Sequence, residues 1–106
     1  MPQCRFKIRV LEDKPVVDQA SRGEALVIDL IANAGFSADL SPPVMTRALC
    51  HFDNAYWLPH VAMHGYSGKT NTQSNTAFRG FGGPQGAIAI ENIVDSVARA
   101  LGKDAL

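Results

Sequence analysis

The residues with the clearest chemical potential lie between positions 74 and 86, in the run SNTAFRGFGGPQG. Four glycines fall within seven residues of this run, and each glycine loses more conformational freedom on folding than other residues do. Glycine is used where the backbone takes an unusual φ/ψ or where another group comes close. Phe78 and Phe81 add apolar rings on which a flat ligand could stack, and Arg79 adds a planar fork of donors. The run is typical of a loop that contacts a ligand.

Two partial motifs, one for nucleotides and one for RNA, fail on their spacing or on the residues that follow them. Gly68-Lys69-Thr70 has the ending of a phosphate-binding P-loop, but the glycine required five residues earlier is replaced by Met63. The stretch 79–82 is similar to the start of an RNA-binding strand, yet Gly83-Pro84 follows, and proline interrupts a central strand. The ten basic and ten acidic side chains cancel, which argues against nucleic acid or an anionic membrane as a partner.

The three histidines also invite a metal interpretation. Of His51, His60 and His64, only the last two have the four-residue spacing that serves a metal on one helical face. Pro59 and Gly65 flank that pair, so a helix is not expected there. We therefore predict surface or hydrogen-bonding histidines.

Composition sets the remaining bounds. The chain has 106 residues, 46% of them hydrophobic, which fits one small globular domain or a piece of a larger one. No apolar stretch approaches the roughly 20 residues that span a bilayer, and the first residues lack a signal core. Cys4 and Cys50 form no metal or disulfide motif, and a cytoplasmic protein with reduced thiols is expected.

Three apolar segments predict strands. Residues 5–10 alternate polar and apolar, whereas residues 25–31 are almost continuously apolar, which favours a buried strand ending at the turn signal 33–35. Residues 56–63 predict an edge strand, because Pro59 cannot donate to a central ladder. The polar stretch 14–23 and the stretch 65–85 predict loops.

Two helices are predicted, at about 42–51 and 86–101. Ser41 would cap the first helix and Pro42 suits its first position, with inward residues Val44, Ala48 and Cys50. The second helix shows apolar residues at helical spacing and has Gly102 as its stop. The inventory predicts an α+β fold with a thin core and long loops, which favours a fragment of a larger domain.

Several separate segments follow one another in the order of a known family: 39–41, 44–49, 52–56, 69–71 and 74–85. From about Ala34 to Gly102 the sequence resembles the molybdenum-binding subunit of the xanthine dehydrogenase family, while residues 1–33 match it poorly. The resemblance implies that residues 1–106 are a fragment of the molybdopterin-binding domain of that family.

The family resemblance also implies a reaction. Its cofactor is molybdenum–molybdopterin, at which an electron-poor ring carbon of a purine is oxidised, converting xanthine or hypoxanthine to urate. Electrons leave through 2Fe–2S clusters to FAD and then to NAD, in an associated Fe–S/FAD subunit or domain.

Individual residues acquire roles from the same resemblance. Arg47 corresponds to the arginine that binds the purine's exocyclic oxygen and steadies negative charge on the ring, and Phe81 to the phenylalanine that stacks on it. Phe78, Arg79 and Gly80 correspond to the loop backbone against the cofactor, with the Arg79 backbone near molybdenum, and the loop glycines make room there. Judged by position alone, Arg47 would be a mid-helix arginine that extends to solvent, and the resemblance reverses that interpretation.

Two further expectations follow from where the family pattern differs. The glutamate that acts as general base lies in a later segment of the family, so this chain alone is expected to be inactive. Aldehyde oxidases commonly carry a bulky residue where Gly83 stands, and an aldehyde oxidoreductase remains an alternative, as does a non-enzymatic remnant or binding module.

Overall fold

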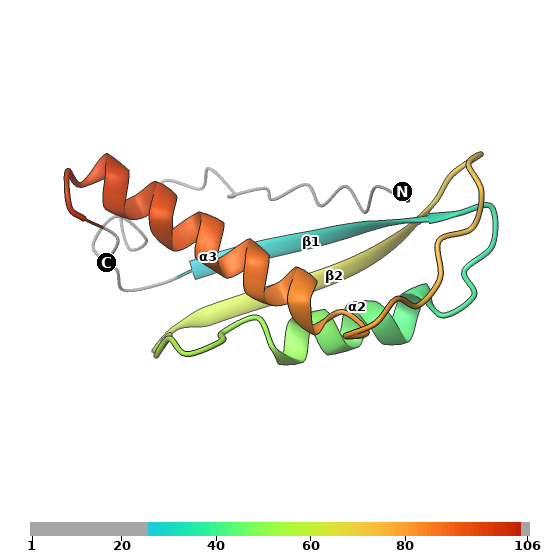
Figure 1. Ribbon diagram of the computed structural model, residues 1–106, viewed down its shortest axis with the longest axis horizontal. Coiled ribbons are helices and arrows are strands. Elements are labelled where there is room, and N and C mark those ends of the chain that lie inside the picture. Colours follow the sequence, from blue (N-terminus) through green and yellow to red (C-terminus); the bar gives the residue numbers. More distant parts are fainter. Residues whose placement is uncertain (1–25, 105–106) are drawn as a thin grey trace.

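The computed structural model describes residues 26–104 as two strands and two helices in one β-α-β-α order (Figure 1). They are β1 (Leu26–Gly35), α2 (Ser41–Cys50), β2 (Val61–Lys69) and α3 (Gly83–Ala100). The strands pair in parallel, with α2 as the crossover between them. This arrangement confirms the α+β prediction, whereas the strand and loop predicted within residues 5–23 lie outside the described residues.

Strand β1 confirms the predicted buried strand and extends it. Ile28 and Leu30 are fully buried on one face, as the apolar run indicates. The strand continues through residues 33–35, which were predicted as a turn. The turn signal is nevertheless present within this end of the strand: Gly35 has a φ of +80° and donates its N–H to the Asn33 side-chain oxygen at 3.0 Å, and the pairing register shifts there. The end stays attached to the segment after β2, because Thr70 donates its backbone N–H to the Gly35 carbonyl at 2.9 Å.

Strand β2 starts later and ends later than predicted. Residues 56–58 have no regular secondary structure and residues 59–60 form a bend, so β2 begins at Val61, two residues after the proline that lacks a donor. The strand then runs to Lys69, into the region predicted as loop. Its polar, glycine-containing sequence is extended because it pairs with β1, with Leu26 opposite Val61 and Gly35 opposite Lys69.

Helix α2 confirms the predicted helix but not its cap. Leu40 is the N-cap and no side chain caps the helix, because the Ser41 hydroxyl instead donates to the Asn75 carbonyl at 2.9 Å. Met45 and Ala48 are buried, whereas Cys50 is an exposed free thiol. The prediction of an inward Cys50 was wrong because, at about 100° per residue, it points away from the face of Met45 and Ala48.

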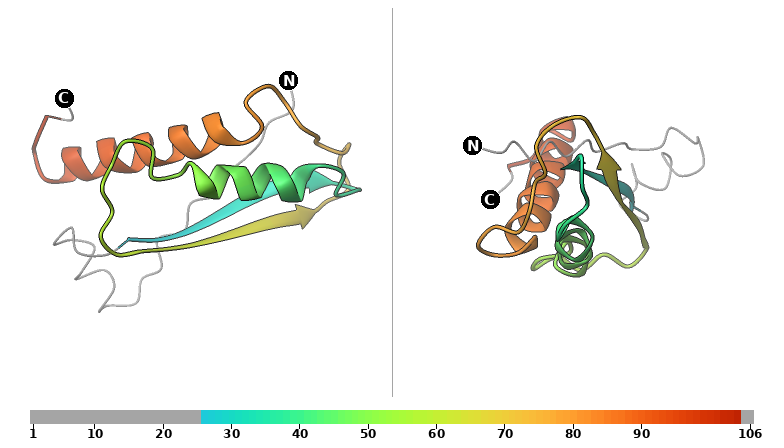
Figure 2. Two further views of the ribbon diagram at one scale, coloured as in Figure 1. Left: turned by 90° about the horizontal axis from the view of Figure 1, so that it is seen from below. Right: turned by 90° about the vertical axis from the view of Figure 1, so that its right-hand side faces the viewer.

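Helix α3 starts three residues before the predicted position. Gly82 has a left-handed φ of +96° and serves as the N-cap, and Pro84 lies in the first turn. Gly102 ends the helix as predicted, with a φ of +65° and with Lys103 donating to the Ala98 carbonyl at 2.9 Å. The last turns of α3 extend beyond the start of the sheet (Figures 1 and 2), which leaves Leu101 59% exposed.

Both helices lie on the same side of the sheet, with α2 against both strands and α3 against α2 (Figure 2). The largest fully buried side chains are Phe52, Ile28, Leu30 and Ile90. Gly65 of β2 allows the close approach of α2, because a Cβ there would lie 2.6 Å from the Met45 Cγ atom. On the other face of the sheet, the His64 Nδ1 atom lies 3.2 Å from an Asp29 carboxylate oxygen, as expected for a hydrogen-bonding histidine.

Candidate functional site

An open depression of about 370 Å³ lies where α2 meets the start of α3. Three parts of the chain form its walls: the exposed face of α2, the turn that follows this helix, and the glycine-rich loop with the first turn of α3. Its lining residues are Arg47, His51, Asp53, Asn54, Gly80, Gly83, Pro84 and Ala87. The depression therefore joins the arginine and the glycine-rich loop that the sequence singled out.

The loop is placed by direct contact between main chains. A Cβ at Gly82 would collide with the Val44 carbonyl oxygen, and a Cβ at Gly86 would collide with the Ala48 carbonyl oxygen. These two glycines thus let the beginning of α3 rest on the backbone of α2. Glycine is therefore required at positions 82 and 86 because the α2 backbone lies against them, a requirement that the sequence did not reveal.

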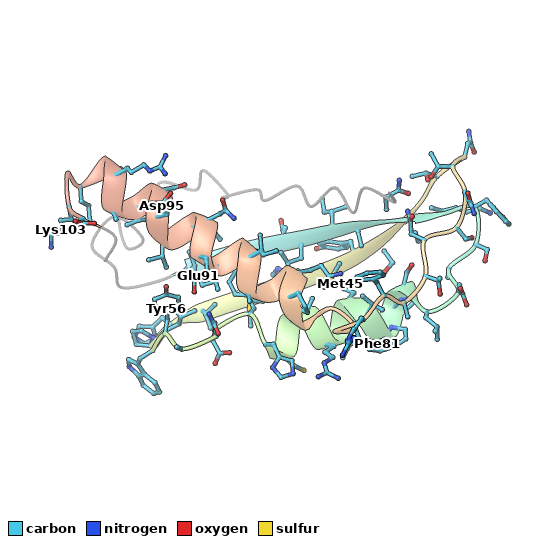
Figure 3. The ribbon with its side chains drawn as sticks, viewed as in Figure 1. Met45, Tyr56, Phe81, Glu91, Asp95 and Lys103 are labelled. Carbon is cyan, nitrogen blue, oxygen red and sulfur yellow. The ribbon has the colours of Figure 1, made fainter. Side chains whose placement is uncertain are left out.

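The loop turns sharply at Gly80 and Phe81. Gly80 has a φ of +93° and Phe81 a φ of +50°, and the latter value is uncommon for a bulky residue. Two local hydrogen bonds close the turn, from the Phe81 N–H to the Phe78 carbonyl at 2.8 Å and from the Gly83 N–H to the Gly80 carbonyl at 3.1 Å. Figure 3 shows Phe81 where the loop passes α2 and enters α3. Such strained backbone concentrates at functional sites.

The predicted site residues fall into two groups. Arg47 is exposed on α2, and a Cβ at Gly83 would lie 4.0 Å from its Nε atom, so Arg47, Gly80 and Gly83 share the depression. Phe78, Arg79 and Phe81, all within the described part of the chain, do not line it. Phe78 is 77% exposed, Arg79 is exposed and Phe81 is half-buried, so these side chains are displayed beside the depression.

The turn after α2 supplies site residues that the sequence analysis missed. His51, Asp53 and Asn54 line the depression beside Arg47. His51 follows Arg47 by four residues, the spacing that places two side chains on one helix face, and this signal could have identified it. Asp53 and Asn54 are residue types that favour turns, and Asn54 has a left-handed φ of +48°.

A carboxylate on α3 holds this turn. Glu91 accepts a hydrogen bond from Asn54 Nδ2 at 2.8 Å through one oxygen and from the Tyr56 hydroxyl at 2.7 Å through the other. Figure 3 shows Tyr56 and Glu91 side by side. The hydrogen bond to Glu91 is the main cause that raises the pKa of Tyr56 above its ordinary value near 10.0.

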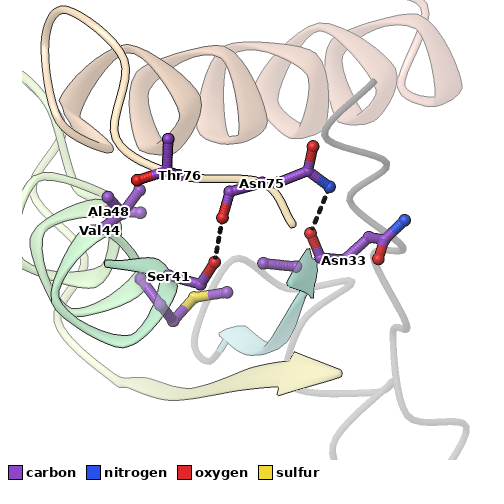
Figure 4. A pocket seen from close by; sticks show the side chains of 8 residues that line it. Asn33, Ser41, Val44, Ala48, Asn75 and Thr76 are labelled. Carbon is purple, nitrogen blue, oxygen red and sulfur yellow. Dashed lines mark hydrogen bonds between the residues drawn. The ribbon is translucent and has the colours of Figure 1, made fainter. Parts of the chain in front are cut away.

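A second polar network ties the glycine-rich segment to the sheet. The Asn75 side chain donates to the Asn33 carbonyl at 2.8 Å, while its own carbonyl accepts from Ser41 (Figure 4). The Thr70 hydroxyl donates to the Asn33 carboxamide oxygen at 2.6 Å. The cavity beside these residues measures about 20 Å³, room for one water at most. This network positions the chain and leaves no space for a ligand.

Side chains alone do not form a metal centre in residues 26–104. Within that range no three His, Cys, Asp or Glu residues are grouped so that they could hold a metal ion. The loop instead has two exposed residues, Arg79 and Gly80, and a Cβ at Gly80 would lie 2.6 Å from the Pro84 Cγ atom, so this turn requires glycine. A metal beside this loop would therefore have to be carried by an organic cofactor.

Comparison with known proteins agrees with this arrangement. The family model for the molybdopterin cofactor-binding domain matches residues 14–106, and the chain belongs to that family. The match extends N-terminal of Ala34, where the resemblance in the sequence begins. No helix within residues 26–104 has the length and apolar character needed to cross a membrane.

Xanthine dehydrogenases are among the similar proteins. The chain is 56% identical to xanthine dehydrogenase of Calliphora vicina over 79 residues, which are 74% of this chain and 6% of that protein. It is 51% identical to xanthine dehydrogenase/oxidase of Gallus gallus over 79 residues, again 74% and 6%. It is 43% identical to nicotinate hydroxylase of Emericella nidulans over 104 residues, 96% of this chain and 7% of that protein. The chain thus spans a small part of the length of these relatives.

Proposed function

We propose that this chain forms the substrate-facing part of the molybdopterin-binding domain in an enzyme that oxidises a purine such as xanthine or hypoxanthine to urate. The observation that carries the proposal is the shared depression, which places the Arg47 guanidinium beside the glycine-rich loop. The similarity to xanthine dehydrogenases supports the substrate class. In the holoenzyme, Fe–S clusters and FAD would carry the electrons to NAD.

Arg47 would bind and orient the substrate. Its planar fork of donors suits an exocyclic oxygen of the heterocycle, and its charge would stabilise negative charge that develops on the ring. Gly83 leaves the space beside the Arg47 Nε atom open, so a planar ring could lie there. The exposed ring of Phe78 and the half-buried ring of Phe81 would add apolar surface beside it.

The loop residues 78–80 would hold the cofactor through their backbone. Gly80 is exposed, and its left-handed φ of +93°, with Pro84 2.6 Å from the place of a Cβ, requires glycine and so keeps this turn free of a side chain. When bound, the molybdenum–pterin group would supply the two-electron oxidation that these side chains cannot perform. This chain's own contribution is to bind the substrate, orient it and stabilise its charge.

The test of the proposal is Arg47→Met in the holoenzyme that carries this chain. The matched control is Arg99→Met, which removes an arginine that pairs with Asp95 on the last turn of α3. We expect Arg47→Met to lower xanthine turnover by about 10²–10³, the usual effect of losing one preorganised donor in a transition state. Aldehyde oxidation should be spared, since it develops no ring charge. Equal loss of both activities would make Arg47 structural.

Nicotinate is the second candidate substrate, because a nicotinate hydroxylase matches 96% of this chain. Its carboxylate would also suit the donor fork of Arg47. Assaying xanthine, nicotinate and an aldehyde with the same preparation separates the two proposals from each other and from the aldehyde oxidoreductase alternative. Oxidation of none of the three, in enzyme with full cofactor content, would favour a non-enzymatic role.

A further inference from the structure

We infer that Glu91 is a positioning residue that fixes the wall of the substrate depression from behind, an inference that rests on the proposed function. Its two carboxylate oxygens accept hydrogen bonds from Asn54 and Tyr56, at 2.8 Å and 2.7 Å. Glu91 does not line the depression in the described structure, whereas Asn54 does. Glu91 therefore acts on the site through Asn54.

The wall that Glu91 holds is anchored in the core by the fully buried Phe52 and is tethered further along the chain by Glu91. It is a tight turn in which the Asn54 N–H donates to the His51 carbonyl at 3.3 Å and the Tyr56 N–H donates to the Asp53 carbonyl at 2.9 Å. Asn54 is in the left-handed region, which a non-glycine residue adopts at some cost. Because three wall residues, His51, Asp53 and Asn54, belong to this turn, its position sets the width of the depression.

The helices themselves are fixed by a different contact. Gly82 and Gly86 seat the start of α3 on the backbone of α2, independently of Glu91. Glu91 lies about two helical turns further along α3 and is exposed. Its removal would therefore release the wall while the two helices stay together. This separation makes a change in substrate fit, without loss of the fold, the expected signature of Glu91.

The experiment uses the holoenzyme and the variant Glu91→Ala. Asp95→Ala is the matched control, since Asp95 is a carboxylate one turn later on α3 that pairs with Arg99 and does not line the depression. We expect Glu91→Ala to raise KM by about 10-fold, as for a displaced substrate-positioning group, with molybdenum content and kcat per molybdenum retained. Asp95→Ala should leave both unchanged.

A double-variant cycle identifies the route of the effect. Asn54→Ala should also raise KM, and Glu91→Ala combined with Asn54→Ala should be no worse than Glu91→Ala alone, because Glu91→Ala already removes the acceptor of Asn54. Glu91→Gln keeps one acceptor oxygen for Asn54 and should recover part of the affinity. Additive effects, or a fall in activity that only follows lost molybdenum, would overturn the inference.

The substrates are chosen so that two failures can be told apart. The series is run with xanthine, nicotinate and an aldehyde, and KM is compared for whichever the wild-type enzyme oxidises. Wild-type enzyme without xanthine turnover refutes the proposed substrate, and the Glu91 inference is then tested on nicotinate or the aldehyde. Normal wild-type activity with an unchanged KM in Glu91→Ala refutes the inference alone. If the wild-type enzyme oxidises none of the three substrates, both the proposed function and the Glu91 inference are refuted.

Discussion

A side chain added at Gly83 would have its Cβ 4.0 Å from the Nε atom of Arg47, and the Arg47 Nε atom is the one neighbour within that distance. Gly83 is the first residue of α3 and its φ is not in the left-handed region, so other residues can adopt its backbone. The size of residue 83 therefore controls the space beside the arginine without disturbing the fold.

We expect Gly83→Phe in the holoenzyme to raise KM for a purine substrate by about 10-fold or more, because the ring would occupy the space beside the guanidinium. Gly83→Ala, which adds one methyl at ordinary contact distance, should change KM little. Steady-state kinetics on both variants, with molybdenum content as a loading control, would test this. A purine KM unaffected by phenylalanine would place the substrate elsewhere.

Substitution of the two contact glycines should act on stability. In Gly82→Ala, alanine would have to adopt a left-handed φ, and its Cβ would clash with the Val44 carbonyl. In Gly86→Ala, the Cβ would clash with the Ala48 carbonyl. Each should cost about 1–3 kcal/mol. Gly68→Ala is the control, because its Cβ would lie 3.6 Å from the nearest atom. The melting temperature of the holoenzyme should be clearly higher for Gly68→Ala than for the other two variants. Similar melting temperatures for all three would contradict a close contact of Gly82 and Gly86 with the α2 backbone.

The 106-residue chain by itself should be marginally stable and should not retain molybdenum. β2 is exposed along most of its length, and large apolar side chains such as Trp57 and Tyr66 are exposed at 87% and 53%. Within residues 26–104 the sheet has two strands with little cover, which gives a small stabilising core. Urea unfolding and elemental analysis of the purified chain would check this. Stoichiometric molybdenum in the chain alone would contradict it.

The hydrogen bond from Tyr56 to Glu91 predicts that the stability of the fold depends on pH. The hydrogen bond to Glu91 raises the pKa of Tyr56 above 10.0, so neutral Tyr56 is favoured by the folded state. The stability that this bond provides is complete below the ordinary pKa of tyrosine and is lost as pH rises through the raised value.

A tyrosinate absorbance titration of the 106-residue chain with the Tyr66→Phe substitution would follow Tyr56 alone, since this chain has two tyrosines. Adding Glu91→Ala should move the transition down toward pH 10, because the acceptor is gone. An unchanged transition would show that the bond does not form in solution.

Local sequence signals predicted the elements that depend on local features. The start of α2 follows from Ser41-Pro42-Pro43, and β1 follows from its branched apolar run. β2 was misplaced because its pairing comes from β1 and not from its own residues, which include two glycines and His64.

The same distinction holds for the site. Arg47 and Gly80 were identified through the family resemblance, and the structure places both at one depression. Glu91 carries no sequence signal, since it meets Asn54 across 37 residues. Contacts between distant residues depend on how α3 crosses α2, and that crossing is set by two glycines whose role only the folded chain reveals.

The contact of Gly82 and Gly86 with the α2 main chain has a consequence for how such a site can diversify. Main-chain atoms, unlike side chains, are present at every position whatever the residue, so the frame does not depend on the identity of Val44 or Ala48. Residues on the rim, such as Arg47, His51 and Gly83, can then change one at a time while the frame stays in place. A new substrate preference is accessible by single substitutions, each evaluated on an unaltered scaffold.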